Sequence, residues 1–319
     1  MEVPRNLKLL RDNIVETMHI FRLPLKDCGS WCREAPRETI LYTGCLNSTM
    51  EIVLRRGRFL DLVTKDPDRD FLASLASYFS RTGPLYRLFI SVGDGRVKEL
   101  PRKAMEILRR VGVDIGCMRD EPYPGMLLYE FGFEDEFKGY APKVYKVLKD
   151  RGVRRLVTID PHVYELMKYV YPEYVDGYDL EVVNYIDIVK EAISSGKIRL
   201  EKPRYTVTYH DPCHYSKSRH RRMIEEPRDI IRASGAEFME TFRRGRFSMC
   251  CGGPIETYFS RLSREIARRR LDELRSTGAE RILVACPICL VSFLSVGGSE
   301  SIDIIEFIYE NMVWGDGLV

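Results

Sequence analysis

Five of the nine cysteines form one pattern in the C-terminal third of the chain. The first is separated by 36 residues from an adjacent pair, and 34 residues separate that pair from a final C-x2-C. Adjacent cysteines do not readily bond to each other, because neighbouring side chains diverge. Five thiolates exceed by one the ligand set of a tetrahedral zinc ion or an ordinary cubane cluster. The spacing therefore predicts one metal site held by Cys213, Cys250, Cys251, Cys286 and Cys289.

The segments around these cysteines place them after the ends of buried strands. TVTYHDPC is a β-branched and aromatic run that stops at Asp-Pro, and RILVACP leads into Cys286 with a proline suited to the first turn of a helix. In MCCGGP, Gly252 and Gly253 allow the backbone to approach an inorganic group and to direct N–H groups at its sulfides. Because sites in open α/β sheets lie at the carboxyl edge, we expect the thiols to converge there.

Two histidines flank Cys213 and are our candidate catalytic residues. His210 precedes it by three positions and His214 follows it directly. Either imidazole can donate a hydrogen bond to a sulfide or protonate a leaving thiolate near neutral pH. The alternative is that they only cap or pack. Tyr215 is expected to be a packing residue close enough to line the site.

The two halves of the chain resemble each other. RGVRRLVTIDPHV at 151–163 matches TGAERILVACPIC at 277–289 with an offset of 126 residues. The repeat predicts an α/β fold of two related Rossmann-like halves with parallel sheets and a helical insertion near 56–98 in the first half. We divide the chain into an N-terminal helical arm (1–37), a degenerate first repeat (38–200) and a second repeat with the intact cysteine motif (201–319).

The first repeat is expected to have lost or altered its metal site. Asp160 and Val163 stand at its C-x-x-C positions, and Gly116 precedes a single Cys117. Only one metal group per chain is therefore predicted.

The remaining cysteines leave two interpretations open. Structural or partner-facing thiols are favoured over a ligand set for Cys28, Cys32 and Cys45, because three cysteines scattered over a loop make a poor site. A separate hypothesis is a mixed zinc-like site in the degenerate first repeat, which would use Cys45, Cys117, His162 and Asp160.

Composition excludes several classes of protein. The chain is 45% hydrophobic and 30% charged with a net charge of +3, which is typical of a globular protein and gives no footprint of nucleic-acid binding. No stretch is long enough to span a bilayer, and the charged N-terminus is unlike a signal peptide, so we expect a cytoplasmic protein. The absence of glutamine and the abundance of arginine and glutamate indicate a thermophilic source, where intracellular disulfides can persist.

The motifs YHDPCHYSKSRH, CCGGP and ILVACPICLVSF, with the helical segments between them, resemble the CCG, or cysteine-rich, domain of heterodisulfide reductase subunits B and D. Their relatives include the iron-sulfur subunits of glycolate, lactate and anaerobic glycerol-3-phosphate oxidation systems. The resemblance implies a [4Fe-4S]-type cluster, non-cubane in heterodisulfide reductase, at which a thiol or disulfide sulfur can bind iron. The implied cluster ligands are the five cysteines of the motif, and the implied activity is that of an oxidoreductase subunit.

The resemblance also implies partners. The ferredoxin motif C-x2-C-x2-C-x3-C-P is absent, so electrons would come from a ferredoxin-like subunit, with a flavoprotein as a further partner and any membrane association supplied by a partner. The segment FRRGRF, with Arg243, Arg244 and Arg246, is either a docking surface or an ion-paired solvated face. Two rival functions stay open, a non-catalytic iron-sulfur or zinc scaffold and a metal-free thiol-disulfide exchanger.

Overall fold

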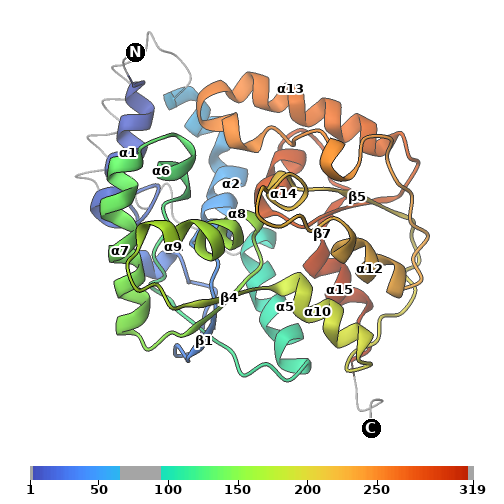
Figure 1. The fold of residues 1–319 in the computed structure, drawn as a ribbon. Helices are drawn as coiled ribbons and strands as arrows, with labels where there is room; N and C mark the ends of the chain where they lie inside the picture. Colours follow the sequence, from blue (N-terminus) through green and yellow to red (C-terminus); the bar gives the residue numbers. More distant parts are fainter. Residues whose placement is uncertain (1–2, 65–94, 315–319) are drawn as a thin grey trace.

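Two parallel β-sheets organise the protein. The computed structural model describes residues 3–64 and 95–314 (Figure 1). Within these ranges one sheet has four strands in the order β2-β1-β3-β4, and the other has three strands in the order β5-β6-β7. Helices cover both sheets, so the predicted α/β class with two related halves is confirmed.

The strands are short and most of their residues are buried, as parallel strands between helices require. The first sheet contains β1 (Thr39–Leu41), β2 (Gly116–Cys117), β3 (Arg155–Thr158) and β4 (Glu181–Asn184). The second sheet contains β5 (Val207–His210), β6 (Arg281–Val284) and β7 (Ser301–Asp303).

Several helices begin directly after a strand and are capped by the side chain at that junction. Asp160, Asn184 and Asp303 each accept a hydrogen bond from a backbone N–H in the first turn of the helix that follows. The first-half helices are α1 (Arg5–Thr17), α2 (Leu46–Thr64), α5 (Arg96–Arg110), α6 (Met126–Glu130), α7 (Glu134–Asp150), α8 (Pro161–Glu165), α9 (Tyr171–Tyr174) and α10 (Tyr185–Ser194). The second-half helices are α11 (Cys213–Ser216), α12 (Glu225–Ala233), α13 (Glu256–Arg275), α14 (Pro287–Ser295) and α15 (Ile304–Asn311).

The two sheets repeat one another in register. β1 pairs with β3 through Thr39 and Arg155, and β5 pairs with β6 through Val207 and Arg281, so the equivalence of 155 with 281 keeps the offset of 126 seen in the sequence. On the other side of β5, Phe238 forms a parallel bridge to Val207, in the place that β2 occupies beside β1. The internal repeat is therefore present in the backbone as well as in the sequence.

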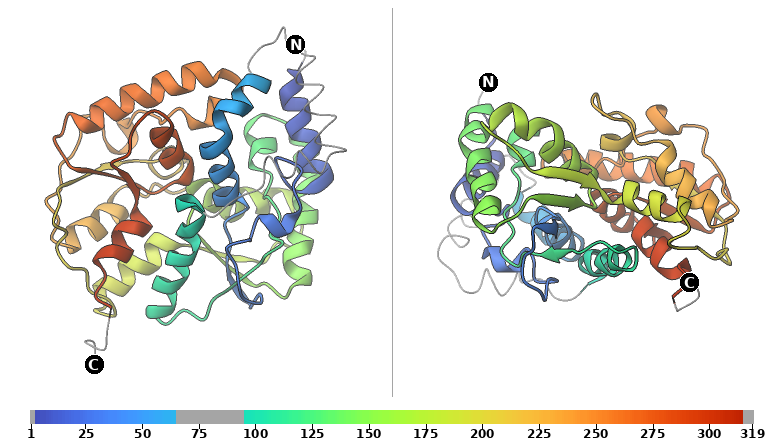
Figure 2. Two further views of the ribbon diagram at one scale, coloured as in Figure 1. Left: turned by 180° about the vertical axis from the view of Figure 1, so that it is seen from behind. Right: turned by 60° about the horizontal axis from the view of Figure 1, so that its bottom comes forward.

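The halves pack against each other through two pairs of helices, and each pair has one helix from either half. First-half α5 contacts second-half α15, and first-half α10 contacts second-half α12. These helices lie side by side in Figure 1, and both views of Figure 2 show the two halves as neighbours along this contact. Arg96 of α5 forms a two-pronged ion pair with Glu306 of α15, and Arg221 does the same with Asp187 of α10. The carboxyl edges of the two sheets are thereby held together.

The first-half cysteines are paired with each other. Cys28 forms a disulfide with Cys45, and Cys32 forms one with Cys117. The mixed zinc-like site that would use Cys45 and Cys117 is therefore wrong for this structure, because disulfide sulfurs carry no thiolate charge for a metal. A structural role for the N-terminal thiols is the interpretation that fits these disulfides.

Two predictions about the organisation of the chain concern the helical insertion and the domain boundaries. The helical insertion predicted near 56–98 falls largely on residues 65–94, outside the described residues. No described helix combines the length and the apolar character that crossing a bilayer requires. The division of the chain at residues 38 and 201 stays a prediction.

Candidate functional site

The five free cysteines come from three segments of the second half and meet at the carboxyl edge of its sheet. Cys213 begins α11 just after β5, Cys286 is the N-cap of α14 after β6, and Cys289 lies in the first turn of α14. Cys250 and Cys251 lie on the loop before α13. Thiol hydrogen bonds connect the sulfurs in the order 213, 250, 251, 289 and 286.

The thiols differ in their tendency to ionise. Hydrogen bonds from Cys213 and Cys251 lower the pKa of Cys250 to about 2. Burial by itself raises the pKa of Cys286, but hydrogen bonds from Cys289 and His162 lower it overall. The pKa of Cys213 is raised, first by its hydrogen bond to Cys250 and then by burial. The neighbours of each thiolate therefore stay protonated, and only bound cationic metal would allow all five sulfurs to ionise together.

The two glycines after the cysteine pair let the loop pack closely. Gly252 has φ +82°, and a Cβ there would lie 2.5 Å from the carbonyl oxygen of Ser263. A Cβ on Gly253 would lie 2.3 Å from Ile288 Cγ2 on α14. The N–H groups of these glycines donate to Cys250 Sγ and Cys251 Sγ at 3.4 and 3.5 Å. A larger residue at either position would push the cysteine pair away from the other thiols.

His210 lies beside the buried thiols. Its side chain is buried, and its Nε2 has no hydrogen-bond partner among the described residues. The ligand atoms of His210, Cys251 and Cys289 lie within 4.8 Å of one another. Burial, and then the charge of Arg270, hold the pKa of His210 well below 6.5, so the ring is neutral. Burying a ring nitrogen without a hydrogen-bond partner is costly. This nitrogen therefore fits a site at which it would donate a hydrogen bond to a bound sulfide-rich group.

His214 lies beside Cys213, is partly buried and lines a cavity next to the thiols. Its Nδ1 is 2.6 Å from Glu165 Oε2 and its Nε2 is 3.1 Å from Glu130 Oε1. Burial and the neighbouring His162 lower its pKa, but the two carboxylates raise it overall. The imidazole is therefore held as a donor to both carboxylates.

The first half contributes two residues that we predicted for a separate site. Asp160 Oδ2 lies 3.8 Å from Cys286 Sγ, the residue at the equivalent position 126 residues later. His162 hydrogen-bonds to the same sulfur, and its ring centroid lies 3.8 Å from that of His214. Burial and the charge of Cys286 raise the pKa of Asp160 to about 7. The site is therefore built at the boundary between the halves, with equivalent strand ends facing each other.

A cavity of about 360 Å³ opens beside Cys213. One wall is apolar and comes from the first half, with Met126, Tyr129, Leu166 and Val170. The other side carries His214 and the exposed Lys217 and Arg219. Tyr215, which we expected near the site, is buried under it, and its hydroxyl accepts a hydrogen bond from Asn184 at 2.7 Å. The cavity gives a small molecule access to the Cys213 corner of the site.

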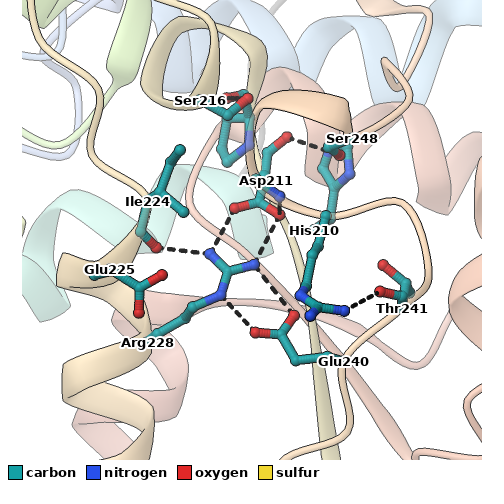
Figure 3. Close-up of polar contacts among 12 residues, drawn as sticks. His210, Asp211, Ser216, Ile224, Glu225, Arg228, Glu240, Thr241 and Ser248 are labelled. Carbon is teal, nitrogen blue, oxygen red and sulfur yellow. Dashed lines mark hydrogen bonds and ion pairs between the residues drawn. The ribbon is translucent and has the colours of Figure 1, made fainter.

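A buried ion cluster fixes the loop that leads to the cysteine pair. Arg228 of α12 donates to both oxygens of Asp211 at 2.6 and 2.9 Å and to Glu240 at 2.6 Å (Figure 3). Asp211 also accepts from the N–H of Gly245 at 2.8 Å. The cluster therefore joins the end of β5 to the loop before Cys250. The sequence showed no sign of this role, because the three charged residues are far apart along the chain.

Removing the arginine of this cluster is expected to destabilise the protein strongly. Arg228→Met leaves the carboxylate of Asp211 buried without its partner, which costs about 3–5 kcal/mol. Arg232→Met on the same helix is the matched control, because Arg232 is half exposed and its carboxylate partners among the described residues are exposed. It should change stability by less than about 1 kcal/mol. Denaturant unfolding measures both, and equal midpoints for the two variants would contradict the assignment.

The loop between this cluster and the cysteine pair also carries an exposed aromatic and basic surface. Phe242 and Phe247 are 94% and 76% exposed. Arg243 pairs with Glu273 at 2.9 Å, whereas Arg244 and Arg246 have no carboxylate partner within the described part of the chain. The solvated ion-paired interpretation therefore holds for the first of these arginines alone.

Comparison with known proteins agrees with this site. Residues 207–293 match the family described as cysteine-rich domain, CCG. The probable iron-sulfur-binding oxidoreductase FadF of Bacillus subtilis is 28% identical over 62% of this chain and 28% of its own length. A dihydromethanophenazine:CoB–CoM heterodisulfide reductase component of Methanosarcina acetivorans is 28% identical over 57% of this chain and 46% of its own length. The chain thus spans less than half the length of these curated relatives.

Among solved structures, a hypothetical protein from Helicobacter pylori is similar, with a TM-score of 0.50. The match has 13% identity and covers 69% of this chain and 47% of that chain, so it bears on the fold alone. The match to the CCG family covers every free cysteine of the site. The segment that holds all five free cysteines is therefore similar to the CCG cysteine-rich domain.

Proposed function

We propose that this chain is an iron-sulfur subunit of a heterodisulfide-reductase-like oxidoreductase complex, which passes electrons between a partner subunit and a thiol, disulfide or other organic acceptor. One observation carries the proposal. Five free thiols meet beside an imidazole nitrogen that has no partner in the described part of the chain, and beside a cavity that reaches Cys213. The names of the relatives, an iron-sulfur-binding oxidoreductase and a component of a heterodisulfide reductase, support the same class of function.

The cofactor that fits this site is a [4Fe-4S]-type cluster, one per chain. Five neighbouring sulfurs need several cationic centres before all can ionise, and five thiolates exceed by one the ligand set of an ordinary cubane, so a non-cubane cluster would fit this set. When bound, the cluster supplies one-electron redox chemistry. The two disulfides of the first half occupy its four cysteines, which supports a single cluster. The proposed ligands are Cys213, Cys250, Cys251, Cys286 and Cys289.

The substrate is proposed to enter the cavity beside Cys213. Reduction of a disulfide breaks its S–S bond, takes two electrons from the partner and two protons, and yields two thiols. His214 lines this cavity, and its imidazole, which is paired with Glu130 and Glu165, is the proposed source of one of the two protons. The exposed Lys217 and Arg219 at the cavity suit an anionic substrate.

Electrons are proposed to enter from the other side, through the loop at 242–247. Its exposed phenylalanines, and the two arginines that have no carboxylate partner among the described residues, suit an acidic ferredoxin-like subunit. Phe247 is three residues from Cys250. A flavoprotein subunit would complete the electron chain. We place the complex in the cytoplasm, with any membrane contact made by a partner.

Metal and sulfide analysis of anaerobically purified protein tests this function. We expect about four irons and about four acid-labile sulfides per chain, because one cluster of this type contains that number. Added thiol should shift the electron paramagnetic resonance signal of the oxidised cluster, since sulfur bound at iron alters its electronic structure. Zinc without sulfide would instead indicate a scaffold. Full-rate disulfide reduction by metal-free protein with a chemical dithiol would establish the thiol exchanger, and about eight irons would refute the single cluster.

A further inference from the structure

Arg270 is a buried arginine of α13 that no part of the proposed electron path uses. Its side chain has no exposed surface. Nη1 donates to Glu273 Oε2 at 2.7 Å and to the carbonyl oxygen of Arg243 at 3.0 Å, while Nε donates to His210 Nδ1 at 3.2 Å. Because burying a guanidinium is costly, a specific role for these contacts is expected.

The contact with His210 determines where that ring carries its proton. Arginine can only donate, so Nδ1 of His210 must be the acceptor and the proton of the neutral ring lies on Nε2. That nitrogen is buried and has no partner among the described residues. One nitrogen of the ring and the sulfurs of Cys251 and Cys289 lie within 4.8 Å of one another. Phe293 packs edge-on against the imidazole, with 5.0 Å between the two ring centroids, and restricts the rotation of that ring.

We propose that Arg270 is a positioning residue, which fixes His210 as an Nε2–H donor toward the sulfurs around Cys251 and Cys289. The expected effect on the reduction potential of the cluster rests on the proposed function. A hydrogen bond to cluster or ligand sulfur stabilises the reduced, more negative state and raises the reduction potential. Glu273 balances the charge of the arginine, so the directed N–H group carries the effect rather than the net charge.

The tautomer itself can be measured without metal. In protein labelled with 15N-histidine, the 15N shifts of the five histidines distinguish Nδ1–H from Nε2–H rings, and His210→Phe identifies the signal. We expect His210 to be the Nε2–H form in the wild-type chain and to lose that preference in Arg270→Met. A wild-type ring protonated at Nδ1 would overturn the proposal, whether or not a cluster ever forms.

The consequence is measured in cluster-loaded protein. Arg270→Met should shift the one-electron reduction equilibrium at least about tenfold toward the oxidised form, which is 59 mV. It should also weaken the coupling between the paramagnetic cluster and the labelled imidazole nitrogen. Arg243→Met is the matched control, because it removes the other arginine partner of Glu273 without touching His210, and it should leave the potential unchanged.

A double-variant cycle separates the positioning role from a direct effect of charge. In a His210→Phe background, Arg270→Met should cause no further shift of the potential, because the arginine acts through the ring. If the shift persists in that background, or if Arg270→Met loads a cluster of unchanged potential, the positioning role is refuted while the proposed function stands. If wild-type protein holds no iron and sulfide, the proposed function fails, and the tautomer measurement still decides the role of the arginine.

Discussion

Cys286→Ser is expected to abolish cluster incorporation. Iron and acid-labile sulfide should fall together from about four per chain to below about one, because a hydroxyl does not replace a soft, ionised thiolate ligand. The effect should be large at this position. Cys286 is completely buried, and hydrogen bonds from Cys289 and His162 favour its thiolate form. Anaerobic metal analysis and the visible absorption of the cluster measure the loss.

Two further variants make the result specific. Cys250→Ser should lose iron to the same degree, since Cys250 is the second thiol whose pKa is lowered. The double variant Cys28→Ser/Cys45→Ser removes a disulfide in the first half and should retain full iron. Full iron in both single variants would show that the five cysteines are not the ligands.

The isolated chain is expected to be a poor catalyst until a ferredoxin-like subunit is added. Arg244→Glu/Arg246→Glu should then lower partner-dependent kcat/KM by at least about tenfold at low ionic strength, because electrostatic steering raises association rates about 10- to 1,000-fold. The defect should shrink as salt increases from about 0.01 to 0.15 M, over which the Debye length falls from about 30 to 8 Å. Stopped-flow reduction by the partner at several salt concentrations measures both changes.

Arg154→Glu is the control for this surface. Arg154 is also exposed, but it precedes β3 at the amino edge of the first sheet, away from the cysteine loop. Its substitution should leave partner-dependent turnover unchanged at every salt concentration. An equal loss in this variant would indicate a general charge effect, and turnover by the isolated chain at full rate would remove the need for a partner.

The strand ends and the cysteine set were predictable from the sequence because both depend on local information. A buried parallel strand needs a short apolar run, and a cysteine just past it must lie at the carboxyl edge of the sheet. The segments TVTYHDPC and RILVACP follow this rule, and Cys213 and Cys286 lie where it puts them. The repeat offset of 126 residues likewise predicted two related sheets, which the matched pairing of β1 with β3 and β5 with β6 confirms.

The sequence by itself thus determined the fold class and the cysteine-rich segment, whereas the tertiary structure decided what surrounds the thiols. Asp160 and His162 were interpreted as remnants of a first-half site, yet they contact Cys286 across the boundary between the halves. The hydrogen bond from Arg270 to His210 joins residues 60 positions apart, and no local pattern predicts it. Periodicity reports which face of an element is buried, but contacts between elements depend on how the helices pack. Here the packing of α5 on α15 and of α10 on α12 sets the two halves face to face and completes the site.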